Sequence, residues 1–174
     1  MVEAFQHLHW GPADWFAELL SEWWVKSLVI IGIGLVADIW TRRFPLGVGL
    51  ATISYLAAED LSLQMKTWFD RERPSVADPA IHPLVAVPHD GSMPSTHAAS
   101  AFAAALAVGF VHPKLRWWLL TLATLISLSR VWLGLHYLSD VIVGAAVGCA
   151  VAWAVWSLSR AAGRAFRERS RTGA

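Results

Sequence analysis

The chain of 174 residues is long enough for one domain, and only 16% of its residues are charged whereas 56% are hydrophobic. This low charge, a mean hydropathy of +0.46 and 11 tryptophans are typical of a membrane protein and argue against an ordinary soluble one. The single cysteine excludes an internal disulfide and a cysteine-rich metal site, and the net charge of +1 gives no reason to expect a nucleic acid partner.

The first predicted element is an amphipathic helix over residues 12–24, which Pro12 begins. Asp14, Glu18 and Glu22 recur every four residues, and tryptophan, phenylalanine and leucine side chains fall on the opposite side. Such a helix is suited to lying in the membrane interface, and packing on its own domain is the equally supported alternative. No cleavable signal peptide is expected, because the first 24 residues contain no Lys or Arg.

Five later segments are long and apolar enough to cross a bilayer. We place these spans at residues 23–40, 45–65, 95–112, 115–135 and 139–158. Residues 67–94 then form an outer loop, and residues 159–174 form a basic tail. The sequence therefore predicts an all-α fold, an integral membrane helical bundle of five transmembrane spans plus the amphipathic helix, in a single domain over residues 1–174.

The positions of the basic residues orient these spans. Nine cations follow the first, third and fifth spans: Arg42, Arg43, Lys114, Arg116, Arg160, Arg164, Arg167, Arg169 and Arg171. If the five spans alternate in direction, all nine fall on one side of the membrane, and the positive-inside rule makes that side cytoplasmic. The outer loop and the amphipathic helix then face the extracytoplasmic side.

The fifth span contains a GxxxG pattern, made by Gly144 and Gly148, and the third span carries several alanines. Small residues at this spacing allow two helix backbones to approach closely. We expect packing within the bundle, with a homodimer as the alternative use of the pattern.

Polar residues gather at the outward ends of the spans, although each charge at membrane depth costs roughly 3 kcal/mol on insertion scales. The set consists of Lys66, Arg73, Ser95, His97, Arg130, His136 and Asp140. Three cations, two imidazoles and one carboxylate on one membrane face have the composition expected of a phosphate site. Glu59 and Asp60 lie nearby on the second span, and we expect them to pair with Lys66 or Arg73, or to line the substrate entrance.

Each part of this cluster has a chemical reason. Pro94 and Ser95 favour the start of a helix, whose unpaired N–H groups and positive dipole end suit an anion. Arginine binds phosphate oxygens with a planar fork, and lysine adds a point charge. His136 and Asp140 are four residues apart and share a face if the helix is continuous, so the carboxylate can fix the tautomer of a nucleophilic imidazole. His97 is then the proton donor to the leaving oxygen.

The three segments K-x6-R-P, P-S-x-H and S-R-x5-H-x3-D, between Lys66 and Asp140, resemble the signature of type 2 phosphatidic acid phosphatases. Vanadium-dependent haloperoxidases and bacterial acid phosphatases share this signature. The resemblance implies that His136 forms a phosphohistidine, that Asp140 orients it and that His97 is the general acid. It also implies a site without metal or cofactor, in which phosphoryl oxygens are bound by Lys66, Arg73, Ser95, Arg130 and the backbone amide of Thr96.

Thr96 departs from the pattern, because the family usually has glycine there. A β-branched side chain narrows the space beside the amide, but a helical first turn suits threonine, so we expect activity to be retained.

The resulting hypothesis is a lipid phosphatase of the bacterial plasma membrane, with its site on the extracytoplasmic side and its C-terminus in the cytoplasm. A polyprenyl diphosphate or phosphate is the first choice of substrate, since short loops leave little protein to read a large head group; phosphatidate and phosphatidylglycerophosphate follow. The main alternative is a non-catalytic protein that binds or transports lipid phosphates. Vanadate-dependent halide oxidation is the other, and five spans without a large soluble scaffold argue against it.

Overall fold

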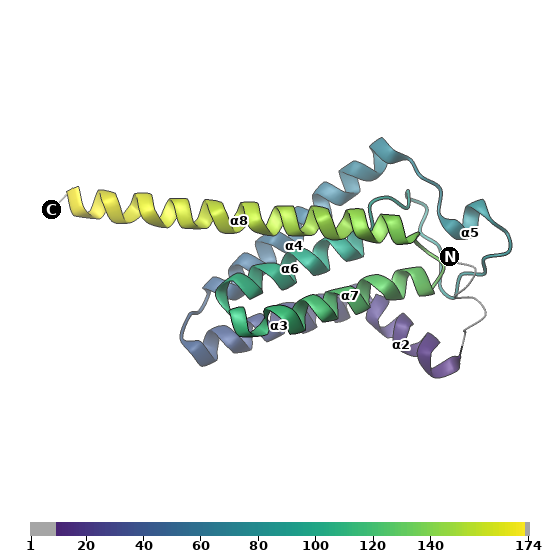
Figure 1. Ribbon diagram of the computed structural model, residues 1–174, viewed down its shortest axis with the longest axis horizontal. Helices are drawn as coiled ribbons and strands as arrows, with labels where there is room; N and C mark the ends of the chain where they lie inside the picture. Colours follow the sequence, from purple (N-terminus) through teal and green to yellow (C-terminus); the bar gives the residue numbers. More distant parts are fainter. Residues whose placement is uncertain (1–9, 173–174) are drawn as a thin grey trace.

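A computed structural model describes residues 10–172, and this part of the chain is helical without a strand, as predicted. The helices are α2 (Gly11–Ser21), α3 (Trp23–Thr41), α4 (Leu46–Phe69), α5 (Pro74–Ala77), α6 (Thr96–Val111), α7 (Arg116–Trp132) and α8 (Leu138–Thr172), with a short 3-10 turn, η1 (Pro113–Leu115). Helices α3, α4, α6, α7 and α8 lie roughly side by side as a bundle (Figure 1).

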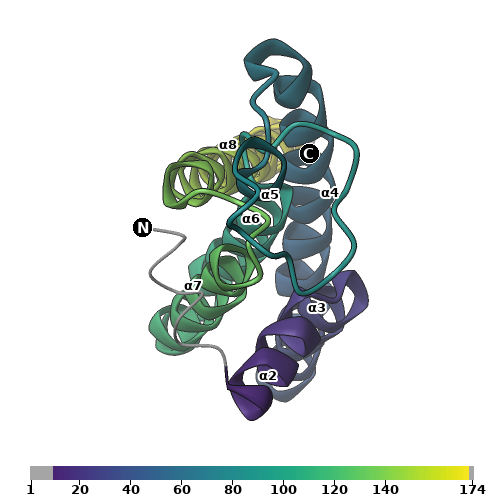
Figure 2. The ribbon, with the colours of Figure 1, turned by 90° about the vertical axis from the view of Figure 1, so that its right-hand side faces the viewer.

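Helix α6 is the centre of this bundle and contacts α3, α4, α7 and α8 (Figure 2). Its sequence, THAASAFAAALAVGFV, is rich in alanine, and most of its residues are buried. Small side chains leave room for the backbones of the neighbouring helices to approach. Helix α8 approaches α6 closely: a methyl group added at Gly144 would stand 2.5 Å from the carbonyl oxygen of Ser95, and one added at Gly148 would clash with the carbonyl oxygen of Ala99. The GxxxG pattern of α8 therefore packs inside the bundle.

The amphipathic segment is separated from the first predicted span by a break at Glu22, whose extended backbone ends α2 and precedes α3. Helix α2 packs against α7, and the indole N–H of Trp132 donates to Oδ1 of Asp14 at 2.8 Å. Ala17 is buried, while Trp15 keeps 64% of its surface exposed. The helix thus packs on its own domain and still presents aromatic side chains outward.

Within residues 10–172, three helices have the length and apolar composition needed to cross a membrane, over Trp24–Thr41, Leu46–Ala77 and Leu138–Arg171. Helix α6 is apolar but has only 16 residues, and at 1.5 Å per residue it is about 24 Å long, shorter than a hydrocarbon core of about 30 Å. Helix α7 has 17 residues and is likewise short. By length and composition alone, the prediction of five spans is therefore supported for three of them.

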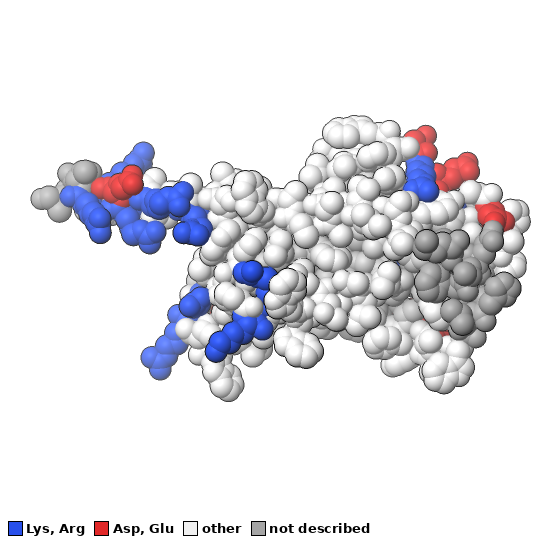
Figure 3. Space-filling view, in the orientation of Figure 1, with Lys and Arg blue, Asp and Glu red and all other residues white. Residues whose placement is uncertain are grey.

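Helix α8 is longer than the predicted fifth span and continues to Thr172 through the residues predicted as a basic tail. Its last turns project beyond the other helices (Figure 1), and basic side chains dominate this end of the molecule, with acidic atoms among them (Figure 3). Acidic and basic groups lie at the opposite end in the same view, and the surface between the two ends is largely free of charged groups (Figure 3).

A buried histidine–aspartate pair joins three helices near the basic end. Nε2 of His112, which follows α6, lies 2.7 Å from Oδ1 of Asp38 on α3. The second carboxylate oxygen of Asp38 accepts the backbone N–H of Val48 on α4 at 2.8 Å. Gly47 is required beside this pair, because an added methyl group would stand 2.5 Å from Oδ1 of Asp38.

Candidate active site

The candidate site lies at the end of the bundle opposite the basic end, where α4 and α7 end and α6 and α8 begin (Figure 1). Two contacts join its segments: Nη1 of Arg73 donates to the carbonyl of Leu135 at 3.1 Å, and the N–H of Ser95 donates to the carbonyl of Asp140 at 3.0 Å. The three motifs, far apart in sequence, thus meet at one end of the molecule.

His136 occupies the turn between α7 and α8, next to Gly134, whose φ of 74° is a conformation that glycine adopts readily. Its Nδ1 lies 3.5 Å from Oδ2 of Asp140, which is an ion-pair distance, longer than a formed hydrogen bond. Oδ2 of Asp140 also accepts the N–H of Tyr137 at 2.9 Å. We expected the two side chains to share a face if one helix ran through both residues. The helix is not continuous there: α8 begins only at Leu138, and its first turn brings the two side chains together.

The free nitrogen of His136 faces Arg73. Nη1 of Arg73 lies 3.2 Å from Nε2 of His136, and because a guanidinium can only donate, Nε2 must offer its lone pair. The ring proton then resides on Nδ1, on the side of Asp140. This tautomer leaves a nucleophilic nitrogen pointing toward the cations.

The charge state of His136 agrees with that geometry. Burial of the ring lowers its pKa to about 4, a contact with Asp140 raises it, and the nearby Arg73, Arg130 and Lys66 lower it again. The imidazole is therefore neutral near pH 7, as a nucleophile must be.

Lys66 and Arg73 are brought together by a residue that sequence reasoning missed. Nζ of Lys66 lies 2.5 Å from Oδ2 of Asp90, and Nη2 of Arg73 lies 2.6 Å from Oδ1 of the same carboxylate. Nε of Arg73 also donates to the backbone carbonyl of Asp90 at 3.0 Å. Burial raises the pKa of Asp90, but the hydrogen bonds from Lys66 and Arg73 outweigh it, so the net pKa is lowered and the group is ionised.

Ser95 and Thr96 stand where α6 begins, and their hydroxyl groups are buried. Ser95 occupies the N-cap position, but its side chain makes no capping hydrogen bond, contrary to the expectation that it caps the helix. Within the described part of the chain, Ser95 Oγ, Thr96 Oγ1 and Nε of Arg130 are buried polar atoms without a hydrogen-bond partner. Buried polar groups are rarely left unpaired, so these three fit a site that takes up an oxyanion.

His97 and Arg130 are neighbours through a shared acceptor. Nε2 of His97 lies 2.9 Å from the carbonyl oxygen of Ser21, and Nη1 of Arg130 lies 3.5 Å from the same oxygen. Because a carbonyl can only accept, the ring proton of His97 is on Nε2. The last residue of α2 therefore covers this side of the site, a contact that no local pattern announces.

Arg71 is a second residue that sequence reasoning missed. Its Nη1 donates to Oδ1 of Asp140 at 2.8 Å and to Oγ of Ser139 at 2.7 Å, and its guanidinium lies 4.0 Å from the ring centre of Tyr137. Asp140 is thus shared between His136 and Arg71. The signal in the sequence was the first arginine of the stretch DRERP, two residues before Arg73.

Glu59 and Asp60 do not pair with Lys66 or Arg73 as expected. Glu59 lies 4.0 Å from Nζ of Lys26 on α3, and Asp60 accepts a hydrogen bond from the side chain of Gln64 at 2.7 Å. Lys26 is 1% exposed and also donates to Oγ of Ser100 at 3.0 Å. A lysine on another helix was therefore the nearer partner of Glu59.

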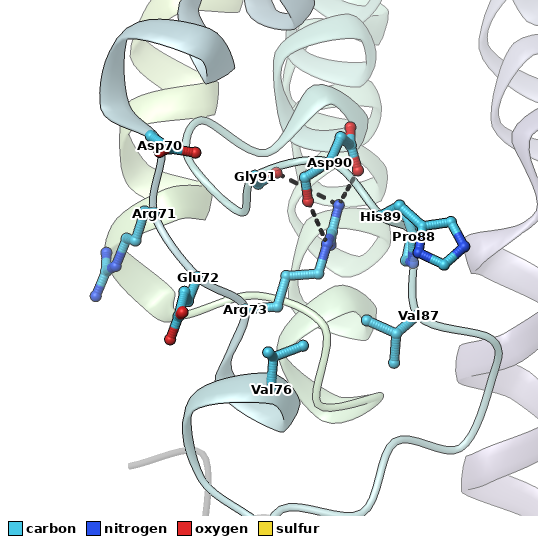
Figure 4. A pocket seen from close by; sticks show the side chains of 10 residues that line it. All are labelled: Asp70, Arg71, Glu72, Arg73, Val76, Val87, Pro88, His89, Asp90 and Gly91. Carbon is cyan, nitrogen blue, oxygen red and sulfur yellow. Dashed lines mark hydrogen bonds and ion pairs between the residues drawn. The ribbon is translucent and has the colours of Figure 1, made fainter.

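A cavity of about 390 Å³ opens beside Arg73 and Asp90 and is lined by Asp70, Arg71, Glu72, Arg73, Val76, Val87, Pro88, His89, Asp90 and Gly91. Figure 4 shows that the side chains of Arg73 and Asp90 point toward each other, whereas Arg71 points away from them. A separate apolar groove of about 300 Å³ runs between α2 and α7 and reaches Ser129, the neighbour of Arg130.

The helical bundle and the cluster of cations and histidines at its end define a class of protein. A sequence model of the PAP2 superfamily matches residues 44–164, well over half of the chain and all three motifs. The chain therefore belongs to the PAP2 superfamily.

Three named bacterial proteins are similar to this chain in sequence. The chain is 32% identical over 123 residues to the bacitracin transport permease protein BcrC of Bacillus licheniformis, a match that covers 70% of this chain and 61% of the relative. It is 31% identical over 116 residues to the undecaprenyl-diphosphatase BcrC of Bacillus subtilis, covering 67% and 58%. The matches thus span about three fifths of these two relatives. The decaprenylphosphoryl-5-phosphoribose phosphatase of Mycobacterium tuberculosis is 35% identical over 140 residues, covering 78% and 71%.

Two solved structures share the fold. The crystal structure of Aquifex aeolicus LpxE has a TM-score of 0.73 and 22% sequence identity, covering 90% of this chain and 92% of that one. A PAP2-type phosphatidylglycerolphosphate phosphatase from Bacillus subtilis has a TM-score of 0.52 and 20% identity, covering 90% of each chain. The helical bundle is therefore a fold that this chain shares with both structures.

Proposed function

We propose that the protein is an integral membrane phosphatase that removes a terminal phosphate from a lipid through a phosphohistidine. One observation carries the proposal: a neutral His136, its carboxylate partner, three cations and three unpartnered polar atoms surround one place at the end of the bundle. Membership of the PAP2 superfamily and the names of the phosphatase relatives support the same activity.

In the first step, the lone pair on Nε2 of His136 attacks phosphorus. The bond between phosphorus and the lipid oxygen breaks, and His97, which takes up a second ring proton when the anionic phosphate binds, gives that proton to the departing oxygen. Asp140 holds the imidazole of His136 in place and stabilises the positive charge that the ring gains as the phosphohistidine forms.

In the second step, water attacks the phosphohistidine while neutral His97 accepts its proton. The bond between phosphorus and nitrogen breaks, inorganic phosphate leaves, and the electron pair returns to His136. Lys66, Arg73 and Arg130 offset the charge on the phosphoryl oxygens during both steps, with the Ser95 hydroxyl and the Thr96 amide as further donors. These cations supply the electrostatic stabilisation without a metal in our scheme.

The substrate we favour is a polyprenyl diphosphate or phosphate, followed by phosphatidate and phosphatidylglycerophosphate. Two relatives carry undecaprenyl and decaprenyl in their names, which supports the first choice. The apolar groove between α2 and α7 is lined in part by Ser129, the sequence neighbour of Arg130, and we place the lipid tail there.

In the membrane we place five spans, with α6 and α7 held within the bundle at less than full bilayer thickness. Helix α2 lies at the interface with Trp15 and Phe16 toward lipid. The concentration of Lys and Arg at one end supports a cytoplasmic C-terminus and an extracytoplasmic site in a bacterial plasma membrane (Figure 3). A homodimer stays a prediction, and it would need a surface other than Gly144 and Gly148, which face α6.

The test is phosphate release in detergent, with a chelator present, from polyprenyl diphosphate, polyprenyl phosphate, phosphatidate and phosphatidylglycerophosphate. The His136→Ala protein is the blank. We expect release from at least one polyprenyl substrate by the natural protein alone. Binding of these lipids without release from any of them would favour a binding or transport protein, and loss of activity on chelation would contradict the metal-free scheme.

A further inference from the structure

The carboxylate of Asp90 stands where the proposed phosphate has to bind. It bridges the ammonium of Lys66 and the guanidinium of Arg73, whose side chains are only 6% and 3% exposed. Its two oxygens contact the two cations as two oxygens of a phosphoryl group would. The protein thus provides its own anion at its cationic pair.

We propose that Asp90 determines specificity by reserving this cationic pair for terminal phosphates and keeping out the phosphodiester head groups of ordinary phospholipids. The inference rests on the proposed function. A protein of this class lies among phosphodiester anions, and two buried cations without a partner would bind them.

The selectivity follows from charge. A phosphodiester carries one negative charge, the same as ionised Asp90, so exchanging one for the other brings no electrostatic gain. A terminal phosphate carries about 1.5 to 2 negative charges near pH 7 and offers three oxygens, so it attracts both cations more strongly than a carboxylate does. Only the terminal phosphate therefore displaces Asp90 effectively.

The surroundings of Asp90 permit this displacement. Its side chain is 41% exposed, it lies in the loop before α6, and Gly91 follows it. The cavity of about 390 Å³ beside Arg73 adjoins the carboxylate and can receive it (Figure 4). Displacement thus requires a movement of the loop and no change in the helices.

A purely structural role, in which Asp90 only neutralises Lys66 and Arg73, makes a different prediction. Loss of a structural anion lowers the temperature of unfolding but does not change which lipids compete for the site. Competition between lipids is therefore the decisive measurement.

The experiment measures hydrolysis of a polyprenyl phosphate in mixed micelles with an increasing mole fraction of phosphatidylglycerol, a phosphodiester. Diacylglycerol at the same mole fractions corrects for surface dilution. We compare the natural protein with Asp90→Asn, Asp90→Glu and the control Asp60→Asn, which removes an exposed carboxylate paired only with Gln64 among the contacts described. For Asp90→Asn we expect half-inhibition at about a tenfold lower mole fraction, the effect of losing one charge-assisted contact. Asp90→Glu and Asp60→Asn should resemble the natural protein.

Equal resistance of Asp90→Asn and the natural protein would overturn the inference. If Asp90→Asn does not fold, the natural protein still tests it, because inorganic phosphate should inhibit at a concentration at least about tenfold lower than dimethyl phosphate. Equal inhibition by the two anions would also overturn it. A natural protein that releases phosphate from no lipid refutes the proposed function instead, so the two failures are distinguishable.

Discussion

The molecule contains a buried histidine–aspartate pair at each end, and the two pairs are built differently. His112 and Asp38 are 2.7 Å apart, and the second oxygen of Asp38 accepts a backbone N–H. His136 and Asp140 are 3.5 Å apart, and the free nitrogen of His136 faces Arg73. Unpartnered donors and a cavity lie near the second pair.

The difference shows what separates a pair with a structural role from the pair that we propose to be reactive. At the basic end, both carboxylate oxygens of Asp38 have hydrogen-bond partners, and these contacts join α3, α4 and the end of α6. At the candidate site, hydrogen-bonding capacity is left unused, and the nearby cations disfavour a charged imidazole. The residue types are the same, so the surroundings decide the role.

The largest effect is expected for His136→Ala, which removes the proposed nucleophile. Phosphate release should fall by at least about 10³-fold, because in the proposed mechanism the lone pair that attacks phosphorus belongs to His136. Equilibrium binding of the lipid phosphate should remain, since the cations are intact. Release within about tenfold of the natural rate would contradict the phosphohistidine mechanism.

The opposite pattern, a loss of stability with little loss of activity, is expected for His112→Ala, which leaves Asp38 buried without its partner. The free energy of unfolding should fall by about 3–5 kcal/mol, measured by thermal or denaturant unfolding in detergent. Activity per folded molecule should stay within about twofold. In the matched control, His112→Leu with Asp38→Asn removes both partners and should recover part of the stability; no recovery would contradict the pairing.

A smaller effect is expected for Arg71→Gln, because Arg71 acts on the reaction only through Asp140. We expect kcat/KM to fall by about tenfold. Without Arg71, Asp140 acts more fully on His136 and raises the pKa of that imidazole, so the acid limb of the pH–rate profile should move to higher pH. Arg71→Lys should restore much of the natural profile. An unchanged acid limb in Arg71→Gln would assign Arg71 a purely structural role.

The smallest effect concerns stability and pH. The pKa of His136 falls from 6.5 to about 4 on folding, chiefly through burial. Between these two pKa values, the unfolded chain binds a proton at His136 that the folded chain does not bind. The contribution of the neutral imidazole to stability is therefore full above about pH 6.5 and is lost as the pH falls toward 4. The melting temperature of the natural protein should drop more steeply over this range than that of His136→Asn. Parallel curves of melting temperature against pH for the two proteins would contradict this prediction.

The sequence alone determined the helical class and the residues of the three motifs. Long apolar segments can satisfy their backbone only as helices in a membrane, so their positions follow from local composition. The spacing of Lys66 and Arg73, and of His136 and Asp140, likewise lies within single short segments. These features depend on neighbours along the chain, and the helices begin and end within a few residues of the predicted segments except at the ends of α4 and α8.

Other features were decided only by tertiary structure. The contacts of Asp90 with Lys66, of Ser21 with His97 and of Lys26 with Glu59 each join segments that are distant in sequence. The central place of α6 also depends on how its neighbours pack, and its apolar sequence alone does not distinguish it from the other predicted spans. Loop closure and helix packing determine which of many chemically equivalent residues become partners, and a local sequence pattern does not specify them.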